Sequence, residues 1–130
     1  MRITPAEEEV TTEVRREDQN NINKFARLNA RLHELRDERK VIKQSLERLD
    51  DALTEIMMST TDNVMLLIGE SFFDTPEDDA TTYCEAEFER MTEVLEKLDE
   101  EESMIIEEQA GLKTVLYGRF GKSIQLEEKV

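Results

Sequence analysis

The sequence predicts a mainly α-helical fold, in which two long helices form an antiparallel coiled-coil hairpin with a single β-hairpin between them. Two ladders of apolar residues at helical spacing predict the helices, and a short apolar segment containing one glycine predicts the β-hairpin. The composition agrees, because 130 residues contain only four glycines and two prolines, while 38% of the residues are charged. We therefore expect one domain over residues 1–130.

The first helix is expected over residues 14–59, a stretch without glycine or proline. Its ladder alternates steps of three and four residues, as the a and d positions of a coiled coil do, and all but one of its positions are apolar. The ladder consists of Phe25, Leu28, Leu32, Leu35, Arg39, Ile42, Leu46, Leu49, Leu53 and Ile56.

The second helix is expected over residues 76–118, with Thr75 as its N-cap and Pro76 in its first helical position. Gly118 and Gly121 are expected to stop it, which leaves residues 119–130 as a C-terminal tail. Its ladder has the same alternation and consists of Phe88, Met91, Leu95, Leu98, Glu102, Ile105, Gln109, Leu112, Leu116 and Arg119.

The equal lengths of the two ladders suggest a register in which Ile56 lies near Phe88. Gln109 then lies opposite Leu35, and Arg39 lies within a turn of Glu102. These two charged residues could pair and fix the register, as polar seam residues often do. The alternative is that both side chains simply extend to water.

Residues 63–74 read as two strands joined at Gly69, whose position suits a type II′ turn. A lone two-stranded hairpin is marginal in water, and this one would expose apolar side chains and strand edges. We expect such hairpins to pair between chains into a shared sheet or β-barrel; the alternative is that the segment folds back onto its own helices. The expected assembly residues are Val64, Met65, Leu66, Leu67, Ile68, Phe72 and Phe73.

The hairpin fold brings both chain ends together at a tip far from the β-hairpin. This tip would carry loosely packed apolar residues, and exposed apolar surface usually marks a binding site. The alternative for Phe25 and Phe120 is that they only cap the coiled coil. The candidate binding residues are Val10, Val14, Ile22, Phe25, Phe120, Ile124 and Leu126.

Charge and composition exclude several classes of protein. The formal net charge of −15 argues against nucleic-acid binding. No apolar run suits a membrane span, and the N-terminus does not resemble a signal peptide. Cys84 is the only cysteine, which favours a reducing compartment. His33 is expected to face water, and no arrangement of residues suggests catalysis, a metal site or a cofactor.

The charge is unevenly distributed. Residues 15–56 hold ten Lys/Arg and nine Asp/Glu, whereas residues 77–108 hold two Lys/Arg and fourteen Asp/Glu. Attraction between the two helices can favour their pairing within one chain. The excess acidity of the second helix either keeps the chain soluble or selects a charged partner.

Three short segments resemble the β-class subunits of prefoldin. They are Glu17–Arg27 near the start of the first helix, Ile68–Phe72 at the hairpin turn, and Leu116–Gly121 with Ile124 and Leu126 at the end of the second helix. The resemblance implies a hetero-hexamer of two α-class and four β-class subunits, whose hairpins form a double β-barrel from which six coiled coils extend.

The resemblance also implies a function. Such a hexamer captures unfolded polypeptides, notably actin and tubulin, at the coiled-coil tips and delivers them to the cytosolic group II chaperonin without ATP. It would act in the cytoplasm, with the nucleus as an additional candidate. The alternative is a coiled-coil scaffold or tether that binds one folded partner and holds no unfolded client.

Overall fold

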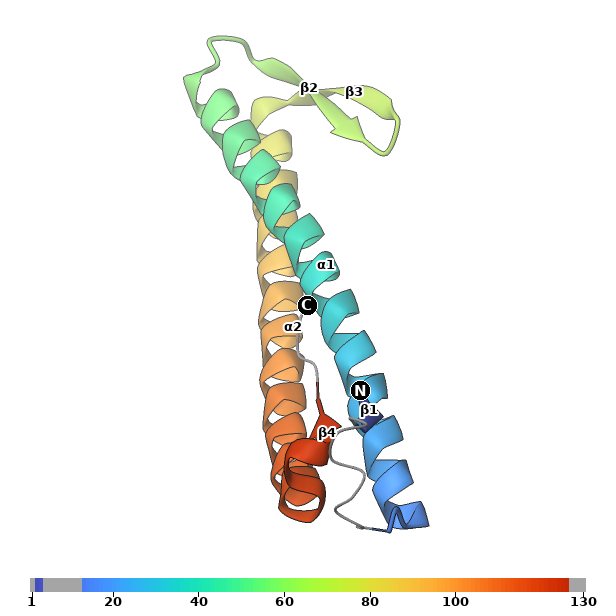
Figure 1. Ribbon diagram of the computed structural model, residues 1–130. Coiled ribbons are helices and arrows are strands. Elements are labelled where there is room, and N and C mark those ends of the chain that lie inside the picture. Colours follow the sequence, from blue (N-terminus) through green and yellow to red (C-terminus); the bar gives the residue numbers. More distant parts are fainter. Residues whose placement is uncertain (1, 4–12, 127–130) are drawn as a thin grey trace. The chain divides into compact units, whose positions relative to one another are not determined.

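The computed structural model describes residues 2–3 and 13–126, and it confirms the mainly helical class with one antiparallel β-hairpin between two long helices (Figure 1). Helix α1 spans Arg16–Met58, strands β2 and β3 span Asn63–Ile68 and Ser71–Pro76, and helix α2 spans Glu77–Phe120. A 3-10 turn η2 (Gly121–Ser123) leads into strand β4 (Ile124–Gln125), which pairs with strand β1 (Arg2–Ile3).

The chain forms two compact units. Unit 1 comprises Met1–Asp37 and Asp99–Val130, and unit 2 comprises Glu38–Leu98. Both long helices contribute residues to each unit. Every residue of the two predicted ladders is buried or half-buried, and the residues between them are mostly exposed. The helical periodicity therefore identified the buried face of each helix correctly.

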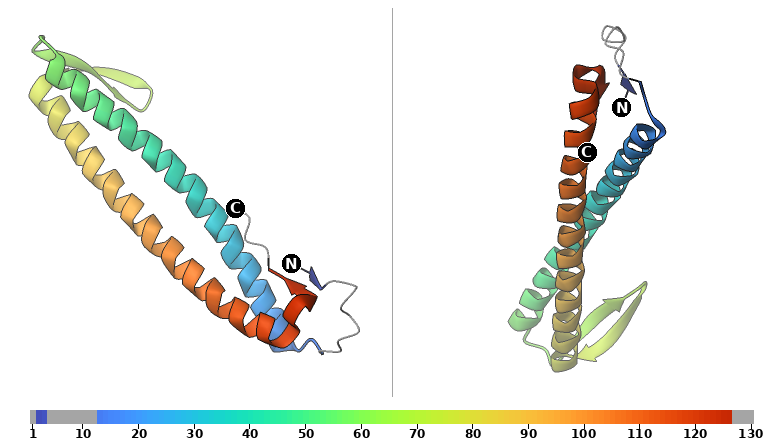
Figure 2. Two further views of the ribbon diagram at one scale, coloured as in Figure 1. Left: turned by 60° about the vertical axis from the view of Figure 1, so that its left-hand side comes forward. Right: turned by 90° about the horizontal axis from the view of Figure 1, so that it is seen from below.

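In unit 2, strands β2 and β3 form an antiparallel ladder in which Val64 faces Thr75 and Leu67 faces Phe72. The turn between them has a positive φ of 65° at Gly69, whereas Glu70 keeps a negative φ. This φ pattern is that of the expected type II′ turn, and it explains why glycine occupies the first central position. In the right-hand view of Figure 2 the two strands extend away from the helix ends.

The contact expected between Ile56 and Phe88 is wrong. Ile56 instead packs with Ala80 and Cys84, near the start of α2. The sheet explains the difference, because its register pairs Asn63 with Pro76 and so returns the chain close to the end of α1. The first turns of α2 therefore lie level with the last turns of α1.

The start of α2 also differs from the prediction. Pro76 is the last residue of β3, and the helix begins at Glu77, whose backbone N–H donates to the carbonyl oxygen of Asp62 at 2.9 Å. The hydroxyl of Thr75 donates to the carbonyl of Phe73 at 3.0 Å and does not act as an N-cap. Proline is tolerated at a strand end, where its missing N–H breaks no interior ladder bond.

In unit 1, ion pairs on the flanks of the helices fix the register. Arg31 donates to both carboxylate oxygens of Glu101, at 2.6 and 3.2 Å, and Lys24 pairs with Glu108 at 2.5 Å. Gln109 follows Glu108, so it cannot lie opposite Leu35, which is about 16 Å further along α1 than Lys24. The expected placement of Gln109 is therefore wrong by about a heptad or more.

The C-terminal end of α2 also differs from the prediction. Gly118 does not stop the helix, which continues to Phe120 and ends before Gly121, where φ is +56°. A glycine inside a helix costs about 1 kcal/mol relative to alanine. Burial of Leu116 and Phe120, one turn apart on the same face, offsets this cost.

Candidate assembly surface and apolar cluster

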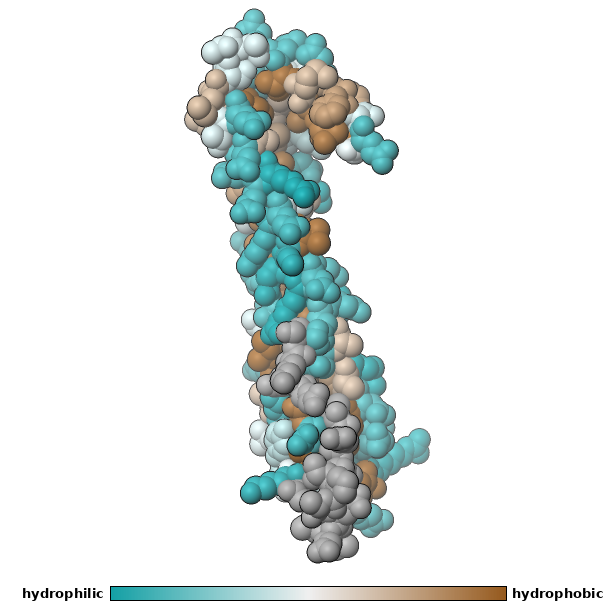
Figure 3. All heavy atoms as spheres, turned by 45° about the horizontal axis from the view of Figure 1, so that its top comes forward, coloured by the Kyte–Doolittle hydropathy of each residue, from teal (hydrophilic) through white to brown (hydrophobic). Residues whose placement is uncertain are grey.

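The β-hairpin of unit 2 presents an exposed apolar face. The strand register places Met65, Leu67 and Phe72 on one side of the sheet, and they are 63%, 54% and 65% exposed. Brown, hydrophobic side chains accordingly gather on the hairpin in Figure 3. In the described part of the chain this sheet has only two strands, so each also offers an unpaired backbone edge.

The opposite face of the hairpin is partly covered by the chain's own helices. Val64 and Leu66 are half-buried and pack against the cluster of Ile56, Ala80 and Cys84. The fold-back of the segment onto its own helices, which the sequence left as the alternative, thus occurs for Val64 and Leu66. The outer face of Met65, Leu67 and Phe72 is left without a cover in the described residues, and Ile68 and Phe73 are also exposed, at 41% and 50%.

A cavity of about 380 Å³ lies where the hairpin meets the helices of unit 2. Ala52, Ile56 and Cys84 contribute to its apolar side, and Ser59 and Asn63 contribute polar atoms. Cys84 is 2% exposed, and burial together with the negative charge of Glu87 raises the pKa of its thiol. The thiol is therefore kept protonated, as expected for a small apolar side chain in a core.

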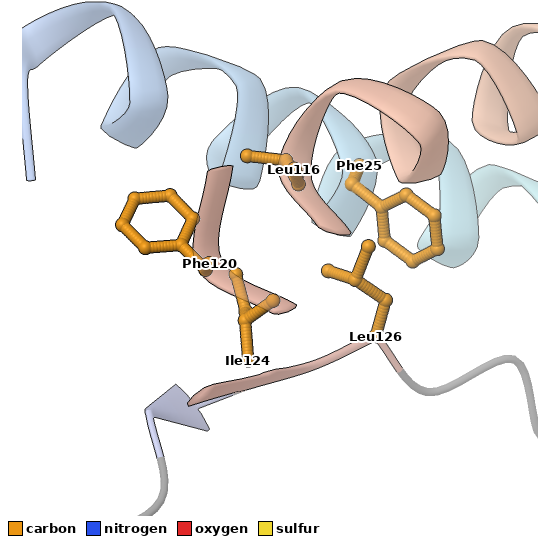
Figure 4. Close-up of a cluster of buried hydrophobic side chains, with 5 residues drawn as sticks. All are labelled: Phe25, Leu116, Phe120, Ile124 and Leu126. Carbon is orange, nitrogen blue, oxygen red and sulfur yellow. The ribbon is translucent and has the colours of Figure 1, made fainter. Parts of the chain in front are cut away.

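The second candidate surface is an apolar cluster at the end of unit 1, formed where α1 begins and α2 ends. Phe25 comes from α1 and Leu116 and Phe120 from α2, and Figure 4 shows Ile124 and Leu126 turned towards them from the C-terminal segment. Ile22 and Leu112 pack against the same cluster. We call this set the tip cluster.

The tip cluster is packed more tightly than the sequence suggested. Phe25 and Leu116 are fully buried, and Phe120, Ile124 and Leu126 are at most 7% exposed. The expectation of loose packing is wrong for these residues, because the C-terminal segment folds back and covers the helix ends. Val14, at 41%, is exposed as expected, and Val10 lies outside the described residues.

Asp18 and Arg119 join the two helices beside the tip cluster. Arg119 Nε lies 2.6 Å from Asp18 Oδ1, and the carboxyl side chain is only 1% exposed. Asp18 Oδ2 also accepts the backbone N–H of Arg15 at 3.0 Å, just before α1 begins. Arg119 further donates to the carbonyl oxygen of Glu13 at 3.0 Å.

These contacts set the charge state of Asp18. Burial alone would raise the pKa of its carboxyl, but the Arg15 N–H and the Arg119 guanidinium outweigh burial and lower the pKa below its usual 3.8. The position near the N-terminus of α1 also favours a negative charge. Asp18 is therefore an ionised residue that both caps α1 and binds α2.

The acidic second helix is partly neutralised by α1 in unit 1. Besides Lys24 and Arg31, Arg36 approaches Glu102 at 4.0 Å. The hydrogen bond from Arg31 lowers the pKa of Glu101, against the opposing effect of burial. Pairing within the chain was expected from the charge difference between the helices. The pairing of Arg39 with Glu102 stays a prediction, because these residues belong to different units.

The structure adds two buried residues that the sequence did not single out, Asp18 and Ala80. Asp18 lies one heptad before Phe25, so extending the first ladder would have found it. Ala80 lies one helical turn before Cys84 and off the heptad spacing, so the ladder does not predict its burial.

Residues 2–3 and 13–126 contain no group of three His, Cys, Asp or Glu side chains placed to hold a metal ion, and His33 is exposed. No helix in the same ranges has an apolar stretch suited to crossing a membrane.

Two long helices with an exposed antiparallel β-hairpin between them define a class of helical-hairpin proteins. The family model described as prefoldin subunit matches residues 19–123. The chain belongs to the prefoldin subunit family, whose members are chaperone subunits in protein folding. Membership implies assembly with other prefoldin subunits, and it confirms the family expected from the sequence.

Several relatives of the chain are prefoldin subunit 4 proteins. The chain is 35% identical to a probable prefoldin subunit 4 of Dictyostelium discoideum, over 97% of this chain and 96% of that protein. It is 36% identical to human prefoldin subunit 4, over 85% of this chain and 84% of that protein. It is 30% identical to the Saccharomyces cerevisiae subunit 4, over 98% and 99% of the two chains.

Among solved structures, the prefoldin beta subunit from Thermococcus strain KS-1 has the same fold. The TM-score is 0.73 at 17% sequence identity, and the match covers 85% of this chain and 98% of the other. At this identity the likeness supports the fold alone.

Proposed function

We propose that this chain is one β-class subunit of a hexamer with two α-class and three further β-class subunits, which holds unfolded polypeptides without ATP. Clients such as actin and tubulin would be delivered to the group II chaperonin of the cytosol. The observation that carries the proposal is the uncovered apolar face of the β-hairpin in a member of the prefoldin subunit family.

The assembly role is assigned to Val64, Met65, Leu66, Leu67, Ile68, Phe72 and Phe73. Among them, Met65, Leu67 and Phe72 make the outer face, while Val64 and Leu66 anchor the hairpin to its own helices. Strands from neighbouring subunits would satisfy the free backbone edges and cover the outer face. This arrangement would form the intersubunit β-barrel.

Client binding is assigned to the tip cluster and its surroundings in unit 1. Ile22, Phe25, Phe120, Ile124 and Leu126 bring apolar side chains together there. Val14, just before α1, and Val115 and Tyr117, near the end of α2, add exposed apolar side chains. Val10 is included on its sequence alone. Many weak apolar contacts suit a protein that must release its client.

The assembly proposal is tested by light scattering of the purified chain, alone and with candidate partner subunits. We expect the chain to enter a complex of six subunits. A stable monomer that recruits no partner would refute the β-barrel and favour the coiled-coil scaffold.

Client binding is tested with a chain trimmed to Arg27–Val115. We expect this variant to keep its place in the complex but to suppress aggregation of an unfolded client less well. Full suppression by the trimmed chain, with its helix content verified by circular dichroism, would refute the tip assignment.

Delivery is tested by reversing the charge of exposed residues on the acidic second helix, for example Glu93→Lys with Glu96→Lys. We expect weaker docking to the chaperonin. Unchanged docking would show that this acidity serves solubility.

A further inference from the structure

The C-terminal segment Gly121–Leu126 turns back over the end of unit 1 in a conformation that resembles a bound peptide. Gly121 adopts a φ of +56°, which allows the chain to reverse after α2, and Ile124 is extended, with φ −125° and ψ 141°. Ile124 and Leu126 are 3% and 7% exposed, whereas Gln125 between them is exposed. This alternation is that of a strand lying with one face on an apolar surface.

The surface beneath this segment is formed by the helices. Phe25 from α1 and Leu116 and Phe120 from α2 contact the two inserted side chains, and Figure 4 shows Ile124 and Leu126 both directed at them. Tyr117 adds one polar contact, since its hydroxyl accepts the backbone N–H of Leu126 at 3.2 Å. We call this the tip groove; it accepts an extended backbone with apolar side chains two residues apart.

Apart from the two inserted apolar side chains, the contacts given for residues 124–126 are made by the backbone. Ile124 and Gln125 of β4 pair with Ile3 and Arg2 of strand β1, and the N–H of Leu126, just after β4, donates to the Tyr117 hydroxyl. Any chain with two apolar residues at the same spacing could make the same backbone contacts. The burial of two side chains is also opposed by the conformational entropy lost when the segment is ordered.

We propose that the tip groove is the client-binding site and that the C-terminal segment is its intramolecular occupant, which an extended apolar stretch of an unfolded polypeptide displaces. This inference rests on the proposed holding of unfolded clients. It divides the tip residues into two groups: Phe25, Leu116 and Phe120 form the site, and Ile124 and Leu126 hold the place of the client. The ligand class is an unfolded segment with apolar residues at positions i and i+2.

The test uses the full chain with Ile124→Ser and Leu126→Ser together, which releases the segment without shortening the chain. The probe is reduced and alkylated lactalbumin, an unfolded protein, and its binding is measured by fluorescence anisotropy. We expect the variant to bind the probe about fivefold more tightly, because the groove is no longer partly occupied. Gln125→Ser is the matched control and should bind as the unaltered chain does.

A competition arm identifies the groove itself. A synthetic peptide of residues 121–130 should displace the probe from the released variant, and the same peptide with serine at positions 124 and 126 should not. Gly121→Ala offers a milder release, since a side chain is strained at the φ of +56° that reverses the chain, while the residues of the tip groove stay unaltered. It should raise affinity in the same direction, even if the double variant loses helix content.

The outcomes separate the two proposals. If neither the unaltered chain nor any variant binds the unfolded probe, the proposed holding function fails. If the unaltered chain binds it, but affinity falls or stays constant in both the double variant and Gly121→Ala, the C-terminal segment is not a competitor and this inference is overturned.

Discussion

Arg119 Nε lies 2.6 Å from Asp18 Oδ1, and this ion pair joins the first turn of α1 to the last turn of α2. The two residues continue the heptad ladders of their helices, so a charged layer closes the coiled coil next to the tip cluster. Because Asp18 also accepts the Arg15 N–H, one carboxylate fixes both where α1 starts and how α2 is placed against it in unit 1.

Asp18→Asn should lower the thermal unfolding midpoint at neutral pH. The folded-state pKa of Asp18 is lowered, so its stabilisation is fully present well above 3.8 and is lost as the pH falls through the folded value. The difference between the unaltered chain and the variant should therefore shrink below about pH 4. Circular dichroism melts at several pH values measure it.

Glu17→Gln is the matched control for this change, because Glu17 lies in the same helical turn and is exposed. It should change the midpoint little. An equal effect of both substitutions would show that the loss of charge near the helix start, and not the buried pair with Arg119, is responsible.

Gln109→Leu should stabilise the chain. Gln109 is 2% exposed, and its Nε2 has no hydrogen-bond partner among the described residues. Removing a buried, unsatisfied amide and continuing the apolar ladder should add about 1–2 kcal/mol to the free energy of unfolding. Urea denaturation measures this value, and Gln44→Leu at an exposed position of α1 is the control.

A lower stability of Gln109→Leu, with Gln44→Leu unchanged, would contradict this expectation. It would indicate that the amide of Gln109 is satisfied in solution.

Leu67→Ser with Phe72→Ser should prevent assembly while leaving the helices intact. These two residues face each other across the strands and are more than half exposed, so the single chain loses little when they become polar. A partner subunit that covers this face of the hairpin, in contrast, would lose its apolar contacts with both residues in the variant. Native mass spectrometry with partner subunits measures the loss.

Asp74→Ser, on the same face of β3, is the control and should assemble normally. If the double serine variant assembled as well as this control, the outer face would not be the assembly surface.

Cys84 should react slowly with thiol reagents at neutral pH. Burial and the charge of Glu87 raise the pKa of its thiol, and the inner face of the hairpin helps to cover it. Val64→Ser should speed up the reaction by weakening the contact between hairpin and helices, whereas Val41→Ser at an exposed position should not. Labelling followed over time by intact-mass measurement gives the rates.

Labelling of Cys84 that is already fast in the unaltered chain would contradict the burial of this thiol. Equal rates for the two serine variants would show that the hairpin does not control access to it.

Much of the fold was determined by local sequence patterns. Steps of three and four residues from Phe25 to Ile56 determine which face of α1 is buried, because helical geometry alone places these side chains in one stripe. Gly69 determines the turn type in a similar way, since its positive φ is strained for other residues. These features depend on neighbours only a few residues apart.

Only the tertiary structure decided the register between the two helices within each unit and the burial of the tip cluster. A heptad ladder packs almost equally well when it is shifted by seven residues, so the choice depends on contacts distant in sequence: Arg31 with Glu101, Asp18 with Arg119, and Ile56 with Ala80. The burial of Ile124 and Leu126 likewise depends on a chain reversal at Gly121 and on a groove made by two helices. Periodicity does not encode such contacts, because they form between segments that meet only when the chain has folded.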